Sequence, residues 1–79
     1  MTEYQTWLAD WFTRRAPQTA LAPEDNYFGV GAIDSFGVIE LIEDMELAFH
    51  VRFTQDDFQD HRFVSIRGLV EMLTEKAGS

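Results

Sequence analysis

Apolar residues in the first segment recur with the spacing of a single helical face. They occur at i, i+3, i+4, i+7 and i+8, and they are Tyr4, Trp7, Leu8, Trp11 and Phe12. This period is typical of an amphipathic helix that turns one stripe toward the core. Thr2 and Gln5 have capping-box spacing, and Pro17 is placed to end the helix. We therefore expect a helix over residues 4–15, with its aromatic stripe in the core rather than at a binding face.

A long connection over residues 16–33 separates this helix from the next one. It is punctuated by Pro17, Pro23, Asn26, Gly29 and Gly31. A loop of this length within a compact domain is uncommon and is often functional. Its apolar residues are expected to pack beneath the helices and to fix the loop, and they are Tyr27, Phe28, Val30 and Ile33.

Three further helices are predicted after this connection. Asp34 or Ser35 can cap the second helix, Thr54 can cap a short third helix, and Ser65 can cap the last one. No stretch alternates with period two for long enough to favour a sheet. The sequence thus predicts an all-α fold, a small four-helix bundle with a long loop between helices 1 and 2. One core is expected to draw on Trp7, Trp11, Leu41, Met45, Leu69 and Leu73.

Length and composition restrict what such a bundle can do. Seventy-nine residues predict a single domain over 1–79, and a monomer is expected. The net charge of −8 disfavours binding to nucleic acid or to an anionic membrane, and it suits a basic partner surface. The absence of Cys excludes disulfides, thiolate metal sites and thiol nucleophiles. With no apolar run of about 20 residues and no signal-peptide pattern, a cytoplasmic location is expected.

The segment Asp34-Ser35-Phe36 is the best candidate for chemistry. A serine that lies where a long loop meets a helix N-terminus has an exposed hydroxyl, and the free N–H groups of the first turn favour an anion. Asp34 beside it could hold a metal ion that serves a modifying enzyme. On these three residues alone, an ordinary helix cap is the preferred interpretation, because Ser and Asp are common capping residues.

The wider context changes that interpretation. The stretch Phe28-Gly29-Val30-Gly31-Ala32-Ile33-Asp34-Ser35-Phe36-Gly37-Val38-Ile39-Glu40-Leu41 resembles the phosphopantetheine attachment region of acyl carrier proteins. In that family an Asp-Ser-Leu motif ends a long loop and begins the second helix. The length, acidic balance and helix order of the chain also resemble the family. The resemblance implies a four-helix fold and a covalent 4′-phosphopantetheine arm that is transferred from coenzyme A by a phosphopantetheinyl transferase.

The resemblance also implies roles for individual residues. Ser35 would be the attachment point, and Asp34 would help to present the serine and the metal to the transferase. Phe36 stands where the family usually has Leu, at a commonly exposed position that contacts partner enzymes. Glu40 matches an acid that docks partners. Three more acids, Glu43, Asp44 and Glu46, lie in the acidic recognition zone of the family.

The charge distribution agrees with a docking role for this region. Residues 34–60 hold eight carboxylates and one arginine, which account for nearly all of the net charge. An acidic face beside the arm would speed the encounter with basic partners. The competing interpretation is a solvated helix face, which any isolated acidic helix could equally be.

These observations predict a discrete carrier protein that is not an enzyme and has no catalytic residues or metal site of its own. Its arm would hold acyl or aminoacyl intermediates as thioesters, loaded by an adenylating ligase or an acyltransferase and consumed by a downstream synthase or transferase. Fatty acid, polyketide and nonribosomal peptide pathways stay open, with a preference for an amino acid or a small acyl group because the motif is somewhat like that of D-alanyl carrier proteins. The alternative is a small acidic helical adaptor without a prosthetic group. His50 and His61 lack metal-ligand spacing.

Overall fold

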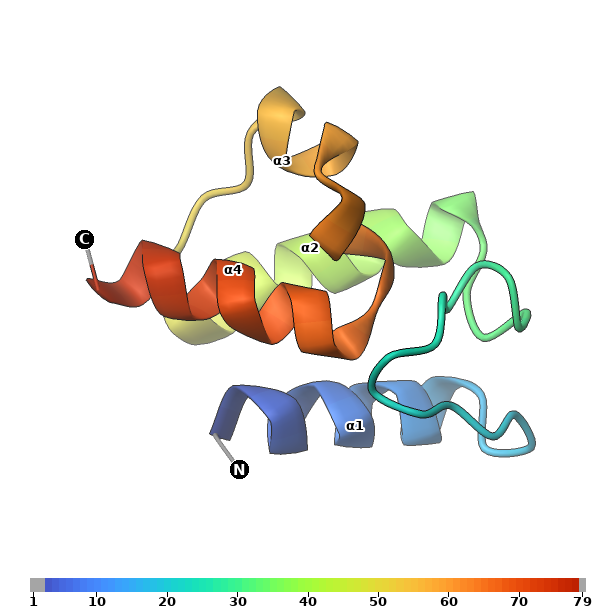
Figure 1. Cartoon of the computed structure of the whole chain (residues 1–79). Helices are drawn as coiled ribbons and strands as arrows, with labels where there is room; N and C mark the ends of the chain where they lie inside the picture. The colour runs from blue at the N-terminus through green and yellow to red at the C-terminus, as the bar shows by residue number, and fades with distance from the viewer. Residues whose placement is uncertain (1–2, 79) are drawn as a thin grey trace.

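The chain folds as a bundle of helices in a computed structural model that describes residues 3–78 (Figure 1). The predicted cap residue Thr2 lies outside the described residues. No strand occurs among the residues that the structure describes, so the all-α prediction is confirmed. The elements are α1 (Glu3–Arg15), α2 (Ser35–Phe49), α3 (Gln55–Gln59), the 3-10 helix η1 (His61–Val64) and α4 (Ile66–Gly78).

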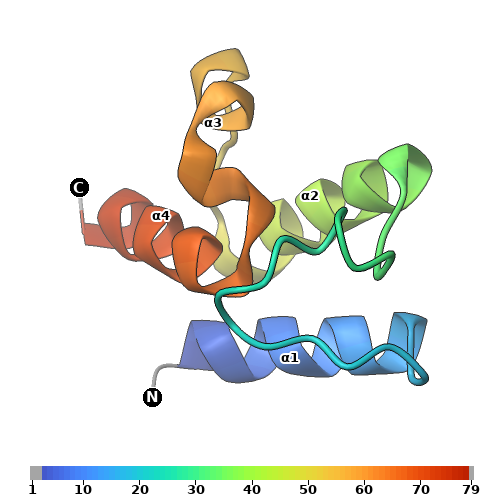
Figure 2. The ribbon, with the colours of Figure 1, turned by 45° about the vertical axis from the view of Figure 1, so that its right-hand side comes forward.

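Three long helices form the body of the bundle. Helices α2 and α4 run in the direction opposite to α1, and α3 with η1 lies on the side of α2 and α4 that faces away from α1 (Figures 1 and 2). The long loop between α1 and α2 turns back along α1 to the start of α4 and then returns to the start of α2. No helix in the described part of the chain is long and apolar enough to span a bilayer.

The core joins all three long helices with the loop. Of the six predicted core residues, Trp11, Leu41, Met45, Leu69 and Leu73 are buried. Trp7 is half-buried and packs against this core, with its ring edge-on to Phe49 at 5.1 Å. The loop contributes Tyr27, Ala32 and Ile33 to the same core.

Helix α4 and η1 touch through their backbones at Gly68, where only glycine leaves enough room. A side chain at Gly68 would begin 2.6 Å from the Cα atom of Arg62 and would overlap the carbonyl group of that residue. Ser65 caps the start of α4, because its hydroxyl accepts a hydrogen bond from the Gly68 N–H at 3.0 Å. The sequence predicted this cap but not η1, whose four residues carry no periodic apolar signal.

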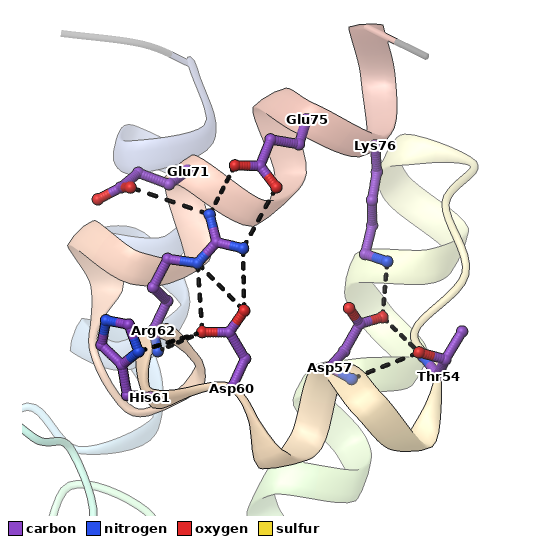
Figure 3. Close-up of polar contacts among 8 residues, drawn as sticks. All are labelled: Thr54, Asp57, Asp60, His61, Arg62, Glu71, Glu75 and Lys76. Carbon is purple, nitrogen blue, oxygen red and sulfur yellow. Dashed lines mark hydrogen bonds and ion pairs between the residues drawn. The ribbon is translucent and has the colours of Figure 1, made fainter.

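Two groups of ion pairs fasten α3 and η1 to the outer side of α4 (Figure 3). Arg62 donates to Asp60 at 2.9 Å and to Glu75 at 2.6 Å. These hydrogen bonds from Arg62 lower the pKa of Asp60 to about 2. Lys76 donates to Asp57 at 2.6 Å, and both side chains are about four-fifths buried. The positions of α3 and η1 are therefore fixed by charge, and η1 is also held by its buried residue Phe63.

The predicted cap of α3 is present. The Thr54 hydroxyl accepts from the Asp57 N–H at 3.3 Å, and the Asp57 carboxylate accepts from the Thr54 N–H at 2.7 Å. Burial works to raise the pKa of Asp57, but the hydrogen bonds from Lys76 and Thr54 outweigh it and lower the pKa. Asp57 thus serves the capping box and the contact with α4 together.

Candidate functional site

The candidate site is built where the long loop enters α2. Asp34 is the N-cap of this helix, with extended backbone angles, and its Oδ1 atom accepts a hydrogen bond from the Gly37 N–H at 2.7 Å. Ser35 is the first residue of the helix and is exposed. Because Asp34 supplies the cap, the Ser35 hydroxyl is not needed for that task. The arrangement leaves an accessible serine oxygen on a rigid helix end.

Gly37 allows three groups to converge beneath this serine. A side chain at Gly37 would begin 2.8 Å from Ile33 Cγ1, 3.1 Å from Arg15 Nε and 3.2 Å from Asp34 Oδ1. These distances are shorter than ordinary van der Waals contacts, so glycine makes the close approach possible. Ile33, the residue before the cap, is buried and so anchors the start of the helix. The Arg15 side chain therefore reaches from α1 to the base of the candidate site.

Tyr27 fixes the loop that delivers Ser35. Its side chain is fully buried, its hydroxyl donates a hydrogen bond to the Phe63 carbonyl, and its N–H donates to the Val64 carbonyl at 2.9 Å. Its own carbonyl accepts from the Ala32 N–H at 3.0 Å. Burial raises the pKa of Tyr27 far above its ordinary value, so the phenol stays neutral. The segment that leads into Asp34 is thereby attached to η1.

The outer part of the loop departs from the expectation that its apolar residues pack inward. Phe28 and Val30 are exposed, whereas Tyr27 and Ile33 are buried as predicted. The reason is a local turn, in which the side-chain oxygen of Asn26 accepts hydrogen bonds from the N–H groups of Phe28 at 2.9 Å and Gly29 at 3.0 Å. This turn carries the segment away from the core. It leaves these two apolar side chains exposed.

Two of the predicted docking acids have partners within the molecule. Glu40 accepts a hydrogen bond from Arg15 and forms an ion pair with it. The Arg15 guanidinium also lies over the Trp11 ring, with its Cζ atom 5.1 Å from the ring centroid. Asp44 accepts from the indole N–H of Trp11 at 2.8 Å. A structural role in joining α1 to α2 therefore accounts for both acids. The sequence analysis did not foresee these contacts, because they span 25 and 33 residues.

The other two acids differ from each other. Glu46 accepts a hydrogen bond from the backbone N–H of Phe53 at 3.0 Å, so it holds the link between α2 and α3. Glu43 is exposed, and no hydrogen bond or ion pair involves it in the described part of the chain. Of the four acids, Glu43 is therefore the one whose carboxylate is open to a partner.

Apolar side chains accompany Glu43 on the outer face of α2. Phe36 is 82% exposed, as its place in the motif predicted, and it follows Ser35 directly. Ile39 and Leu47 are also exposed, at 56% and 77%. Sequence reasoning missed Ile39 and Leu47, although both lie off the helical face that carries the expected core residues Leu41 and Met45. That position was the signal that could have found them.

No group of three or more metal-binding side chains occurs among the described residues. His50 ends α2 in the left-handed conformation, at a φ of 56°, and both His50 and His61 are exposed. The described residues thus present an exposed serine hydroxyl beside an acid, together with exposed apolar side chains on α2.

Comparison with known proteins gives one match. The family model described as "Phosphopantetheine attachment site" matches residues 8–73. This range includes α2, the whole of the long loop and most of α1 and α4. No match was found among curated proteins or among solved structures.

Proposed function

This chain belongs to the phosphopantetheine attachment family, and we propose that Ser35 is the residue that bears its prosthetic group. Proteins of this family carry 4′-phosphopantetheine covalently and act as carriers rather than as catalysts. The observation that carries the proposal is the exposed Ser35 at the first position of α2, with Asp34 already acting as the cap. We propose residues 1–79 as a single carrier domain.

The residues around Ser35 fit the group. The arm joins the protein through a phosphodiester, which is an anion, and Arg15 Nε lies near Gly37, two residues beyond Ser35. Asp34 stays available beside the serine to help a transferase position its metal ion. When bound, the arm supplies a terminal thiol that holds cargo as a thioester. The protein has no Cys, so this thiol is chemistry that the chain itself lacks.

The cargo is proposed to be an amino acid or a small acyl group. The support is the motif Phe28-x-x-Gly31-x-Ile33-Asp34-Ser35-Phe36, which is more similar to carriers charged by adenylating ligases than to Asp-Ser-Leu carriers of fatty acid synthesis. An adenylating ligase or acyltransferase would load the arm, and a downstream synthase or transferase would consume the thioester. A cytoplasmic location is part of this proposal.

Partner enzymes are proposed to dock on the outer face of α2. Phe36 and Ile39 offer apolar contact area close to Ser35, and Glu43 offers an open carboxylate one turn further along the helix. Apolar anchors set the strength of such a contact, while a charge at its edge acts mainly on the rate of association. Glu40, Asp44 and Glu46 shape the same face through their negative charge.

The attachment is tested by the mass of the intact protein. Purified apo protein is incubated with coenzyme A, magnesium and a broad-specificity phosphopantetheinyl transferase. We expect a gain of one phosphopantetheine in the wild type and in Ser65→Ala, but not in Ser35→Ala. Circular dichroism establishes that each variant is folded. A folded wild type that gains nothing would contradict the carrier proposal and would favour the acidic adaptor instead.

A further inference from the structure

Glu40 lies at the border between the outer face of α2 and the contact of α2 with α1. It follows Phe36 by about one helical turn, so the two side chains are neighbours on the helix surface. Phe36 is exposed and belongs to the face proposed for docking. The Glu40 carboxylate, however, accepts a hydrogen bond from Arg15 of α1. The first acid of α2 is therefore occupied in the free protein.

Three features hold Arg15 against the start of α2. Its Nη1 atom donates to Glu40, and its Cζ atom lies 5.1 Å from the centroid of the Trp11 ring. The absence of a side chain at Gly37 leaves room for its Nε atom. A shallow depression that is open to solvent runs over this contact, and it is lined by Trp11, Arg14, Arg15, Glu40 and Asp44. The ion pair is thus accessible from outside the protein.

The ion pair of Arg15 with Glu40 can be exchanged for another, unlike the contacts of two other acids on α2. Its side chains are 38% and 52% exposed, and an exposed ion pair adds little to stability. Release of Asp44 would instead leave the half-buried indole N–H of Trp11 without its acceptor. Glu46 likewise accepts from a half-buried backbone N–H. Glu40 is therefore the paired acid that a partner can recruit at the lowest cost.

We propose that Arg15 occupies Glu40 in the free protein and that a basic side chain of a docking partner displaces it. This inference rests on the proposed docking of partner enzymes on α2. Docking then becomes a competition for one carboxylate, in which the partner gains a contact with Glu40 and the protein gives up its own. Arg15 is therefore a specificity-determining residue. A partner that brings no cation to this place gains nothing from Glu40, whereas a partner arginine reproduces the contact that Arg15 gives up.

The affinity of the apo protein for a broad-specificity phosphopantetheinyl transferase tests this displacement. Isothermal titration calorimetry measures the affinity without coenzyme A. We expect Arg15→Gln to bind about two- to fivefold more tightly than the wild type, because an exposed ion pair no longer competes for Glu40. Arg14→Gln is the matched control. It makes the same change of charge one residue away, and Arg14 has no ion pair among the described residues. Its effect should be smaller.

A second background separates competition for Glu40 from simple repulsion. If Arg15 acts by occupying Glu40, its removal has no special effect once that carboxylate is neutral. In a protein that carries Glu40→Gln, Arg15→Gln should therefore change the affinity no more than Arg14→Gln does. A gain that persists without the carboxylate would overturn the inference, because Arg15 would then repel the partner directly. Equal affinities of Arg15→Gln and Arg14→Gln in the presence of Glu40 would also overturn it.

Nuclear magnetic resonance observes the exchange in the wild type, so it does not depend on the folding of any variant. The ¹⁵N-labelled apo protein is titrated with unlabelled transferase. We expect the Nε–H signal of Arg15 to shift, while the indole N–H of Trp11 stays protected from exchange with water because Asp44 does not release it. An Arg15 signal that stays unchanged when binding is complete would overturn the inference.

This inference and the proposed attachment fail in different ways. The affinities are measured without coenzyme A, so they do not depend on modification of Ser35. Loading of the wild type, with equal affinities for Arg15→Gln and Arg14→Gln, would overturn the displacement and leave the attachment intact. The expected order of affinities, with an intact mass that never increases, would remove the attachment and leave the displacement. An absence of any binding would contradict the docking on α2 and the displacement together.

Discussion

At the scale of single residues, two glycines determine how closely the elements around the site approach one another. Gly37 lets Arg15, Ile33 and Asp34 converge beneath Ser35, and Gly68 lets the backbone of Arg62 rest on α4. Neither role follows from the sequence, because glycine in a helix is ordinarily read as a small loss of stability. Gly37 makes room for Arg15, which is distant in the chain, and Gly68 makes room for Arg62, which belongs to η1, an element that the sequence did not predict.

Gly68→Ala should destabilise the protein. The new methyl group would overlap the carbonyl of Arg62, so η1 or α4 must move. Overpacking of this kind costs about 1–3 kcal/mol, more than the gain of about 1 kcal/mol from replacing a helical glycine. Urea unfolding measures the difference. Gly29→Ala is the matched control, because a side chain there begins at ordinary contact distances. Equal unfolding midpoints for both variants would contradict the packing described.

Tyr27→Phe should also lower stability, although it removes only one oxygen. The Phe63 carbonyl would lose the hydrogen bond that it accepts from the Tyr27 hydroxyl in a buried setting. An unsatisfied buried group costs about 1–3 kcal/mol. Tyr4→Phe is the control, because Tyr4 is only half-buried and packs its ring against Phe49. The free energy of unfolding in urea should fall more for Tyr27→Phe, and the reverse order would contradict the role given to Tyr27.

At the scale of elements, the four predicted helices could be found from the sequence, but the contacts that join them could not. Local patterns placed the caps at Asp34 or Ser35, at Thr54 and at Ser65, and they placed the end of the first helix, since capping and periodicity act within a few residues. The same patterns made Ser35 a candidate, and the resemblance to acyl carrier proteins made it the predicted attachment point. The contacts of Trp11 with Asp44 and of Arg15 with Glu40 join residues that only the folded chain brings together. The sequence could not show which of the four acids predicted to dock partners has a contact within the molecule, whereas in the structure only Glu43 lacks one among the described residues.

Because Glu43 has no contact that joins it to the rest of the protein among the described residues, its substitution should change docking without changing stability. Glu43→Lys should slow loading by a partner enzyme by about threefold or more at low ionic strength, because a charge at an interface edge acts on association. Its urea midpoint should be unchanged. Asp10→Lys, an exposed change of equal charge on α1, should affect loading less. Equal loading rates and equal salt dependence for the two variants would exclude Glu43 from the docking face.

Asp44→Lys should behave in the opposite way. It removes the acceptor for the half-buried indole N–H of Trp11, which costs about 1–3 kcal/mol. A loading defect in this variant would therefore combine lost stability with lost charge. The measurement that separates the two effects is the urea midpoint, which should fall for Asp44→Lys and not for Glu43→Lys.

At the scale of the whole molecule, two regions are held together in different ways. The α1 and α2 side of the bundle is joined by the core, and Tyr27 attaches the long loop to η1, whereas α3 and η1 are fastened to α4 by Arg62 and Lys76. Ser35 is on the first of these regions. The ion pairs of Arg62 and Lys76 set the positions of η1 and α3 and do not involve the serine directly.

Acid should loosen the second region. The folded-state pKa of Asp60 is about 2, below its ordinary value of 3.8, so its contribution to stability is complete above that ordinary value and is lost as the pH falls toward 2. The urea midpoint should fall over this interval, and less steeply in Arg62→Gln. Arg67→Gln, which breaks an exposed pair with Glu24, is the control. Parallel pH profiles for wild type and Arg62→Gln would contradict this account.

The identity of the modified residue is the most direct test of the central claim. The loaded protein is digested, and fragmentation of its peptides locates the phosphopantetheine along the chain. The account predicts the arm on Ser35 and on no other residue, including Ser65. An arm on another residue, or a loaded protein whose Ser35 peptide is unmodified, would contradict it.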